Sequence, residues 1–157
     1  MIRTLLVFLP LFIAGCYSNK PIASLDKAIF DESLLGRWST IDDEGEFILT
    51  VSKLREKEYL AVPAEEPDAP MQFFITEIDG ERFINAREIH DGKVDEDYMF
   101  GRLSTSDDNE VLIEVPELDA VPHEVTSSEE LLQVFSENMD KPGFFSDKPK
   151  VYHRMAN

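Results

Sequence analysis

The sequence feature that most constrains the fold is a series of short apolar runs separated by turn signals between residues 36 and 115. In the run EFILTVSK, the apolar residues 47, 49 and 51 would share one face of a β-strand. Asp79-Gly80 lies between two such runs and accepts the positive φ angles of a tight hairpin. We therefore expect seven strands from Gly36 to Val115, in an antiparallel sheet or barrel.

Two features within these runs indicate curvature and an outer cover. Gly101 would weaken a flat strand, so a bulge or a sharp bend of a barrel is the expected reason for it. Phe73 and Phe74 are adjacent and point to opposite faces of a strand. One of the two rings must therefore be covered by something other than the barrel interior.

A helix that could supply this cover is predicted over residues 128 to 140. Ser127 and Glu130 have the spacing of a capping box, and Pro142-Gly143 ends the pattern. One apolar stripe runs along the helix, formed by Leu131, Val134, Phe135 and Met139. The later segment KVYHRM can form a last strand, which gives a mainly β fold: a small antiparallel barrel of about eight strands with one α-helix in the C-terminal half.

The N-terminal sequence has the pattern of an export signal. Arg3 supplies a positive start, residues 5 to 13 an apolar stretch, and Ala14-Gly15 the small residues before a cleavage site. A helix needs about 20 apolar residues to cross a bilayer core of ~30 Å, so we expect no permanent transmembrane helix here.

The residues Ile13-Ala14-Gly15-Cys16 resemble the lipobox of bacterial lipoproteins. The resemblance implies that the Cys16 thiol receives a diacylglyceryl group and that Cys16 becomes the acylated first residue of the mature chain. Two or three acyl chains hold a protein firmly to a membrane. Tyr17 stands where an inner-membrane retention signal has Asp, which implies the bacterial outer membrane, facing the periplasm. The alternative is an ordinary secretory signal whose cleavage site includes Cys16.

This interpretation divides the chain into three parts. Residues 1–15 are the signal peptide, residues 16–24 the lipidated N-terminus and a polar tether, and residues 25–157 one barrel domain. Residues 25 to 35 suit a turn or two of helix that leads into the domain.

The first expected strand opens with Gly36-Arg37-Trp38, and the last carries Arg154. With the series of strands and the late helix, these residues resemble the lipocalin or calycin architecture, in its up-and-down barrel form. The resemblance implies that Trp38 sits at the closed end of the barrel and that Arg154 packs across its ring in a cation–π contact. Arg102 is the competing partner for Trp38. The alternative is that Trp38 is a core aromatic of another β-fold.

The charge of the chain limits its partners. Acidic residues outnumber Lys and Arg by 32 to 15, a formal charge of -17, so nucleic acid is not an expected partner. The acidic surface either keeps the protein soluble or steers a basic partner toward it. With one Cys there can be no intramolecular disulfide, and stability must come from packing.

Catalytic and metal-binding patterns are not found in the sequence. His90, His123 and His153 are scattered without the spacing of zinc ligands, and the acidic turns at 95–97 and 107–109 lack the pattern of a calcium loop. No Ser lies in a nucleophile-elbow pattern. We therefore expect no enzyme, no cofactor and no metal.

Two functions remain. The first is a non-catalytic binding module for a small apolar or amphipathic ligand, with the membrane contacted through the lipid on Cys16. In that case the alternation of Ile84 and Ala86 with Asn85 and Arg87 leaves open which pair lines the cavity. The alternative is an acidic interaction protein or inhibitor that binds a basic partner in the envelope.

Overall fold

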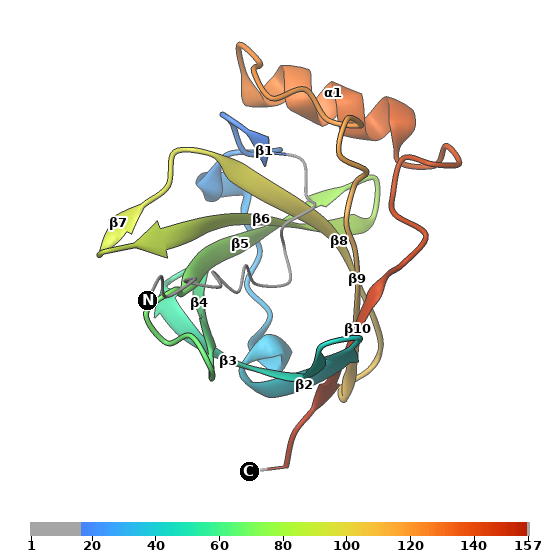
Figure 1. Cartoon of the computed structure of the whole chain (residues 1–157). Coiled ribbons are helices and arrows are strands. Elements are labelled where there is room, and N and C mark those ends of the chain that lie inside the picture. Colours follow the sequence, from blue (N-terminus) through green and yellow to red (C-terminus); the bar gives the residue numbers. More distant parts are fainter. Residues whose placement is uncertain (1–16, 157) are drawn as a thin grey trace, which may run out of the picture.

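The computed structural model describes residues 17–156 (Figure 1). These residues form ten strands, one α-helix and two short 3-10 helices, η1 (Leu25–Lys27) and η2 (Glu32–Leu34). The strands are β1 (Tyr17–Ser18), β2 (Gly36–Asp42), β3 (Gly45–Arg55), β4 (Glu58–Pro63), β5 (Met71–Ile78), β6 (Glu81–His90), β7 (Lys93–Val94), β8 (Tyr98–Asp107), β9 (Glu110–Glu114) and β10 (Lys150–Arg154). The α-helix is α1 (Ser128–Asn138). No helix within residues 17–156 is long and apolar enough to cross a membrane.

Eight of the strands close into an antiparallel barrel. Going around it, the order is β2, β3, β4, β5, β6, β8, β9 and β10, and the pairing of β10 with β2 completes the ring. Apart from the small β7, neighbours in the ring follow one another along the chain, so the barrel is of the up-and-down kind. The predicted fold class is confirmed, and the helix lies in the C-terminal half.

The hairpin turns form as their sequences indicate. Asp79 and Asp91 both adopt φ of 51°, and each is followed by a glycine with positive φ, 81° at Gly80 and 74° at Gly92. Two consecutive positive φ angles match the right-handed twist of the flanking strands, and Asp-Gly is a favoured pair for them. These two turns set the register of β5 with β6 and of β6 with β7.

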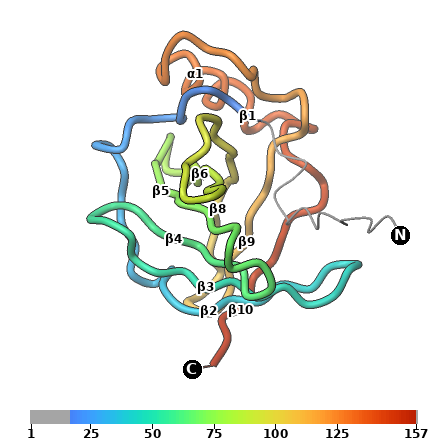
Figure 2. Tube along the Cα trace, turned by 60° about the vertical axis from the view of Figure 1, so that its left-hand side comes forward, coloured from blue at the N-terminus to red at the C-terminus, as the bar shows by residue number. Residues whose placement is uncertain are grey.

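The barrel wall separates two apolar cores. The first fills the barrel interior, and the second lies outside it, between the wall and α1. Figures 1 and 2 show α1 lying over one side of the barrel. Phe73 faces the interior, whereas Phe74 is buried on the outer face, where its ring meets that of Tyr98. The expectation that the two rings need separate covers agrees with this arrangement.

The outer core is built around Phe135 of α1. This ring is fully buried and makes edge-to-face contacts with Phe83 of β6, Phe100 of β8 and Phe144. Edge-to-face pairs add about 0.5 to 1.5 kcal/mol each beyond the burial of their area. The helix is therefore held to the barrel mainly by one aromatic cluster.

The N-terminal cap of α1 differs in detail from the expected capping box. The Ser127 hydroxyl accepts a hydrogen bond from the Glu130 backbone N–H at 3.2 Å, as expected. The Glu130 carboxylate reaches back to the backbone N–H and hydroxyl of Thr126, both at 2.8 Å, one residue further than in the usual box. These hydrogen bonds lower the pKa of the Glu130 carboxyl.

Residues 17 to 24 are not a free tether, which corrects one sequence prediction. Tyr17 and Ser18 pair with β8 as strand β1, and Ile22 is fully buried in the outer core. The Ile22 N–H donates to Asn85 Oδ1 at 2.7 Å, and Asn85 Nδ2 donates to Thr76 Oγ1 at 3.0 Å. The segment packs there because buried polar groups on the outer face of the barrel need hydrogen-bond partners. Cys16 and the predicted signal peptide lie outside the described residues.

Candidate functional site

One end of the barrel is closed by residues around Trp38, which we call the floor: Leu34, Gly36, Trp38 and Arg154. The Arg154 guanidinium lies over the Trp38 ring, with 4.3 Å between Cζ and the ring centroid. The Trp38 indole N–H donates to the backbone oxygen of Leu34 at 3.0 Å, which fixes η2 beneath the ring. Arg102, the competing partner in the sequence, lies elsewhere: it pairs with Glu114 at 2.8 Å and covers the ring of Phe145.

Arg154 holds three chain segments together at the floor. Its Nε donates to the backbone oxygen of Asp108 at 2.9 Å, Nη1 to that of Leu35 at 2.9 Å, and Nη2 to that of Ser33. Gly36 is required beside it, because a Cβ there would come within 2.9 Å of Nη1 and because its φ is +129°. The letters Gly-x-Trp therefore mark the site where the barrel is closed.

Above the floor, the barrel encloses a cavity of about 60 Å³. Its walls are apolar side chains from η2 and from all eight barrel strands, together with one tyrosine. The lining residues are Leu34, Trp38, Leu49, Val51, Ala61, Met71, Phe73, Ile84, Ala86, Leu103, Val111, Ile113 and Tyr152.

The register of β6 settles which of its side chains face the cavity. Ile84 and Ala86 line the interior, whereas Asn85 is buried outside under the N-terminal segment. Arg87 also faces outward and covers the ring of Tyr98, with 4.7 Å from Cζ to the centroid. The polar face of this strand therefore does not line the cavity.

Gly101 lies close to a side chain of the neighbouring strand. A Cβ at this position would meet Ile113 Cγ2 at 2.7 Å, so the glycine makes room for a side chain of the neighbouring strand β9. The irregular register of β8 occurs further along, between Thr105 and Asp107. The register shows no bulge at Gly101 itself, and close packing across two strands gives a further reason for a glycine at this position.

Tyr152 of β10 brings a hydroxyl group into this apolar interior. The residue is 3% exposed, and its hydroxyl makes no hydrogen bond to residues 17–156. In that part of the chain, the Ser18 hydroxyl is the only side-chain polar atom that is both sealed off and without a partner. The Tyr152 hydroxyl therefore borders open space within the barrel. Burial raises the pKa of its phenol above the usual range, and the charge of Asp42 adds to this, so the group stays neutral.

Tyr152 was missed in the sequence, although a signal was available. It lies two residues before Arg154, so alternation puts both side chains on one face of the last strand. The resemblance places Arg154 against Trp38 inside the barrel, and the same face carries Tyr152 inward.

Beside the cavity, three aromatic rings stack in a row. Tyr59 lies between Phe30 and Phe73, with 4.6 Å between centroids on each side. The Tyr59 hydroxyl accepts from the Asp31 N–H at 2.6 Å and donates to the Asp31 backbone oxygen at 3.2 Å. Both ends of this stack, Phe30 and Phe73, are partly exposed, and Phe73 lines the cavity.

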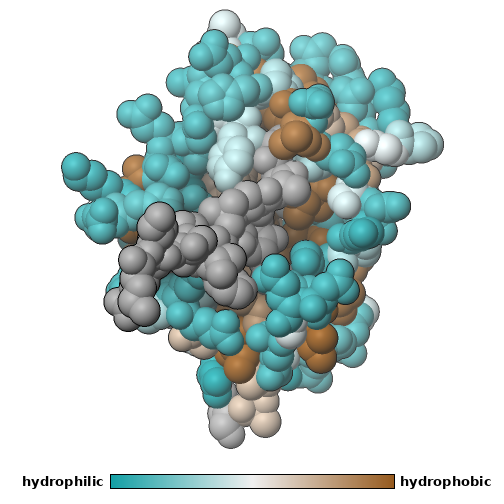
Figure 3. All heavy atoms as spheres, viewed as in Figure 1, coloured by the Kyte–Doolittle hydropathy of each residue, from teal (hydrophilic) through white to brown (hydrophobic). Residues whose placement is uncertain are grey.

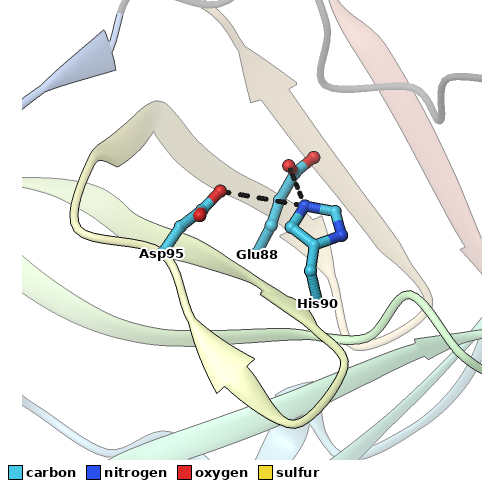
Figure 4. Close-up of side chains that lie close together, drawn as sticks. All are labelled: Glu88, His90 and Asp95. Carbon is cyan, nitrogen blue, oxygen red and sulfur yellow. Dashed lines mark hydrogen bonds and ion pairs between the residues drawn. The ribbon is translucent and has the colours of Figure 1, made fainter.

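A cluster of ionisable groups lies at the far end of β6 and on the connection after β7, where Glu88 and His90 continue the face of β6 that carries Ile84 and Ala86 (Figure 4). His90 Nε2 is 3.0 Å from Glu88 Oε2 and 3.7 Å from Asp95 Oδ2, and the three donor atoms lie within 4.8 Å of one another. The hydrogen bond to Glu88 raises the pKa of His90. A divalent cation could replace the proton here, with an imidazole and two carboxylates as ligands. Alternation places Glu88 and His90 on one face, but the approach of Asp95 depends on the turn and was not predicted.

The other two histidines are not brought near this cluster. His123 pairs with Asp97 at 3.3 Å and His153 with Glu110 at 3.7 Å, and both are exposed. The cavity lining contains no acid, base or nucleophile besides the neutral Tyr152 phenol. Comparisons with models of protein families, with curated protein sequences and with solved structures found no match.

Proposed function

We propose that this protein is a lipocalin-like lipoprotein of the bacterial envelope that binds a small apolar or amphipathic molecule inside its barrel, without catalysis. The observation that carries the proposal is the apolar cavity above a closed floor, with one neutral hydroxyl in its wall. Binding sites for small molecules commonly combine apolar walls with a few polar groups that fix orientation.

The size of the cavity limits what can enter. An engineered cavity of roughly 150 Å³ holds benzene, and the space here is about 60 Å³. The apolar part of the ligand is therefore slim, and its entry displaces lining side chains. Met71 and Phe73 are suited to this, because a methionine side chain is flexible and Phe73 is partly exposed at the end of its stack.

The proposed location rests on the sequence around Cys16. An apolar stretch ending in Ile13-Ala14-Gly15-Cys16 supports lipid attachment, and Tyr17 supports the outer membrane, facing the periplasm. Labelled palmitate should enter the wild-type protein in bacterial cells and should not enter Cys16→Ser. Equal labelling and equal localisation of the two proteins would disprove the anchor.

The binding proposal is tested with a protein that begins at Tyr17, which keeps every strand, both cores and the floor. The fluorophore N-phenyl-1-naphthylamine should bind at about one site per protein and be displaced by 1-dodecanol. Ala61→Leu fills the cavity and should weaken binding at least about tenfold. Val62→Leu is the matched control, since alternation places it on the outer face of β4, and it should bind as the wild type does.

Two results would count against the proposal. If no fluorophore binds to the folded protein, or if Ala61→Leu and Val62→Leu bind equally well, the barrel is not the binding site. Circular dichroism of both variants shows that the comparison is made between folded proteins. Loss of the barrel site would favour the alternative function, an acidic surface that binds a basic partner.

A further inference from the structure

Many acidic residues lie at the end of the barrel opposite the floor. Connections of an up-and-down barrel alternate between its two ends, and β2 begins at the floor with Gly36. Residues 42–45, 64–70 and 91–97 therefore connect strands at the far end, and we call these three connections the rim. They contain ten carboxylates and one lysine. Figure 2 shows the connection after β4 and the β6–β7 hairpin on the side of the barrel that faces the viewer.

The rim carries a larger total charge than the floor-side turns, because its connections are longer. The three turns at 56–57, 79–80 and 107–109 carry four carboxylates and one lysine. On the face shown in Figure 3, hydrophilic side chains dominate the surface, with apolar patches between them. A ring of like charge around an apolar interior attracts counter-charged molecules and repels anions.

The cavity itself has a polar group toward this charged end. Tyr152 shares a face of β10 with Lys150, and Lys150 Nζ is 3.8 Å from Asp42 Oδ2 at the rim. Asp42 is also the charge that acts on the Tyr152 phenol. The unpartnered hydroxyl and a rim carboxylate thus lie on the rim side of Trp38 and Leu34. A ligand with its apolar part toward the floor would place its polar group near Tyr152, where a cationic group would compete with Lys150 for Asp42.

Resting on the proposed function, we infer that the ligand is a cationic amphiphile: a slim apolar chain with a protonated amine. The neutral phenol oxygen accepts a hydrogen bond from an ammonium N–H, and the rim carboxylates supply the opposite charge. A ligand with a carboxylate or phosphate head would bring negative charge into the same place. The geometry therefore selects by the sign of the head group as well as by the width of the chain.

Three probes with one chain length test the inference, each used below its critical micelle concentration. Dodecylammonium should displace N-phenyl-1-naphthylamine best, 1-dodecanol less well and dodecanoate least. The affinities of the two ions should differ at least about tenfold at low salt, and the difference should shrink near 0.5 M sodium chloride, because screening weakens the rim field.

Single-residue variants test which side chains cause the selectivity for a cationic head group. Asp42→Asn should reduce the preference for dodecylammonium several-fold and leave 1-dodecanol binding unchanged. Asp107→Asn is the matched control at a floor-side turn, and it should change neither the preference for dodecylammonium nor the binding of 1-dodecanol. Tyr152→Phe should weaken 1-dodecanol and dodecylammonium together, since both lose a hydrogen bond while the shape of the cavity is kept.

The outcomes separate this inference from the proposed function. Equal displacement by all three probes would overturn the cationic head group and leave the binding function standing. Absence of fluorophore binding in the wild type would overturn the function itself. Tight binding of a lysine-rich amphipathic peptide, without binding of dodecylammonium, would overturn the inference in favour of a basic protein partner.

Discussion

Arg154 shows how one side chain can close a barrel. Its planar guanidinium covers the Trp38 ring and donates to the backbone oxygens of Ser33, Leu35 and Asp108. These oxygens belong to η2, the entry to β2 and the β8–β9 turn, and the turn is distant in sequence from the other two. A fork of several donors in one plane is a property of arginine that lysine lacks.

We expect Arg154→Met to lower the free energy of unfolding by about 2 to 4 kcal/mol, from the loss of one cation–π contact and several hydrogen bonds. Arg154→Lys should recover less than half of this loss, because one ammonium cannot reach all three oxygens. Urea denaturation followed by Trp38 fluorescence measures both. Arg37→Met, at an exposed position of the same strand pair, is the control and should have little effect. A full recovery with lysine would disprove the role of the planar fork.

The ion pairs of His90 give stability that depends on pH. The pKa of His90 is raised in the folded protein, chiefly by its hydrogen bond to Glu88, so the folded state binds the proton more tightly than the unfolded state. The resulting stabilisation is present below the unfolded pKa of about 6.5 and is lost as the pH rises through the folded pKa.

The NMR titration of the His90 ring should therefore give a pKa above the ordinary histidine value of about 6.5. Glu88→Gln should lower the pKa of His90 toward the ordinary value and reduce stability at about pH 5.5 more than at about pH 8. A His90 titration that does not move in Glu88→Gln would contradict this account. Addition of zinc at about pH 8 would shift the same resonances if the cluster also binds a cation.

The N-terminal segment is joined to the outer face of the barrel by a buried hydrogen bond, beside the pairing of β1 with β8 and the hydrogen bonds of Asn19. Asn85 on β6 accepts from the backbone of Ile22 and donates to Thr76, and all three residues are buried. A buried amide that satisfies two neighbours cannot be replaced by an apolar group of similar size without leaving both unpaired. The order of residues 17 to 24 is thus linked to the outer face of the barrel.

Asn85→Leu should destabilise the protein by about 2 to 4 kcal/mol and release the segment. Hydrogen exchange should show lost protection at the Ile22 amide, while the amides of β3 keep theirs. Gln133→Leu, an exposed amide on α1, is the control and should preserve the Ile22 amide. Unchanged exchange at Ile22 in Asn85→Leu would mean that apolar packing alone holds the segment.

The elements that follow a clear period could be predicted, and those that depend on distant contacts could not. The strands from Gly36 to Val115 alternate, and the stripe around Leu131 and Phe135 repeats with the helical period. Strand β1 has two residues in a polar stretch, and it forms because β8 offers it an edge. Residues 25 to 35 form 3-10 turns where a turn or two of helix was expected, since backbone contacts such as Ile29 with Ile75 tie them to the barrel.

For the candidate site, the residues of the floor could be predicted from the sequence, whereas the cavity in the barrel interior could not. Gly36, Trp38 and Arg154 could be named because a known architecture has residues of these types at these places. The cavity depends on the volumes of thirteen side chains from elements throughout the fold, and no local pattern reports the space that remains between them. Whether a barrel is filled or hollow is a property of packing.

In the molecule as a whole, repulsion between the many carboxylates opposes folding into a compact state. The chain carries a formal charge of -17, and folding brings these carboxylates closer together. Self-repulsion of this kind destabilises a compact state and is screened by salt. The few ion pairs at the surface each contribute little in comparison.

The urea midpoint of the protein should therefore rise between about 20 mM and about 0.5 M sodium chloride. The double variant Asp95→Asn/Glu96→Gln removes two rim charges and should show a smaller rise. A midpoint that falls with salt would mean that attractive ion pairs outweigh the repulsion. Sucrose, which does not screen charge, serves to separate this effect from general stabilisation by a cosolute.

The pairing of Tyr17 with β8 bears on how far this protein can reach. One residue of extended chain spans about 3.6 Å at most, and Cys16 immediately precedes the first paired residue. A fatty acid on that cysteine would hold the barrel directly on the bilayer surface, with no spacer to let it search the periplasm. The barrel could then bind only ligands that reach the membrane surface, either by diffusing within the bilayer or by leaving it next to the protein.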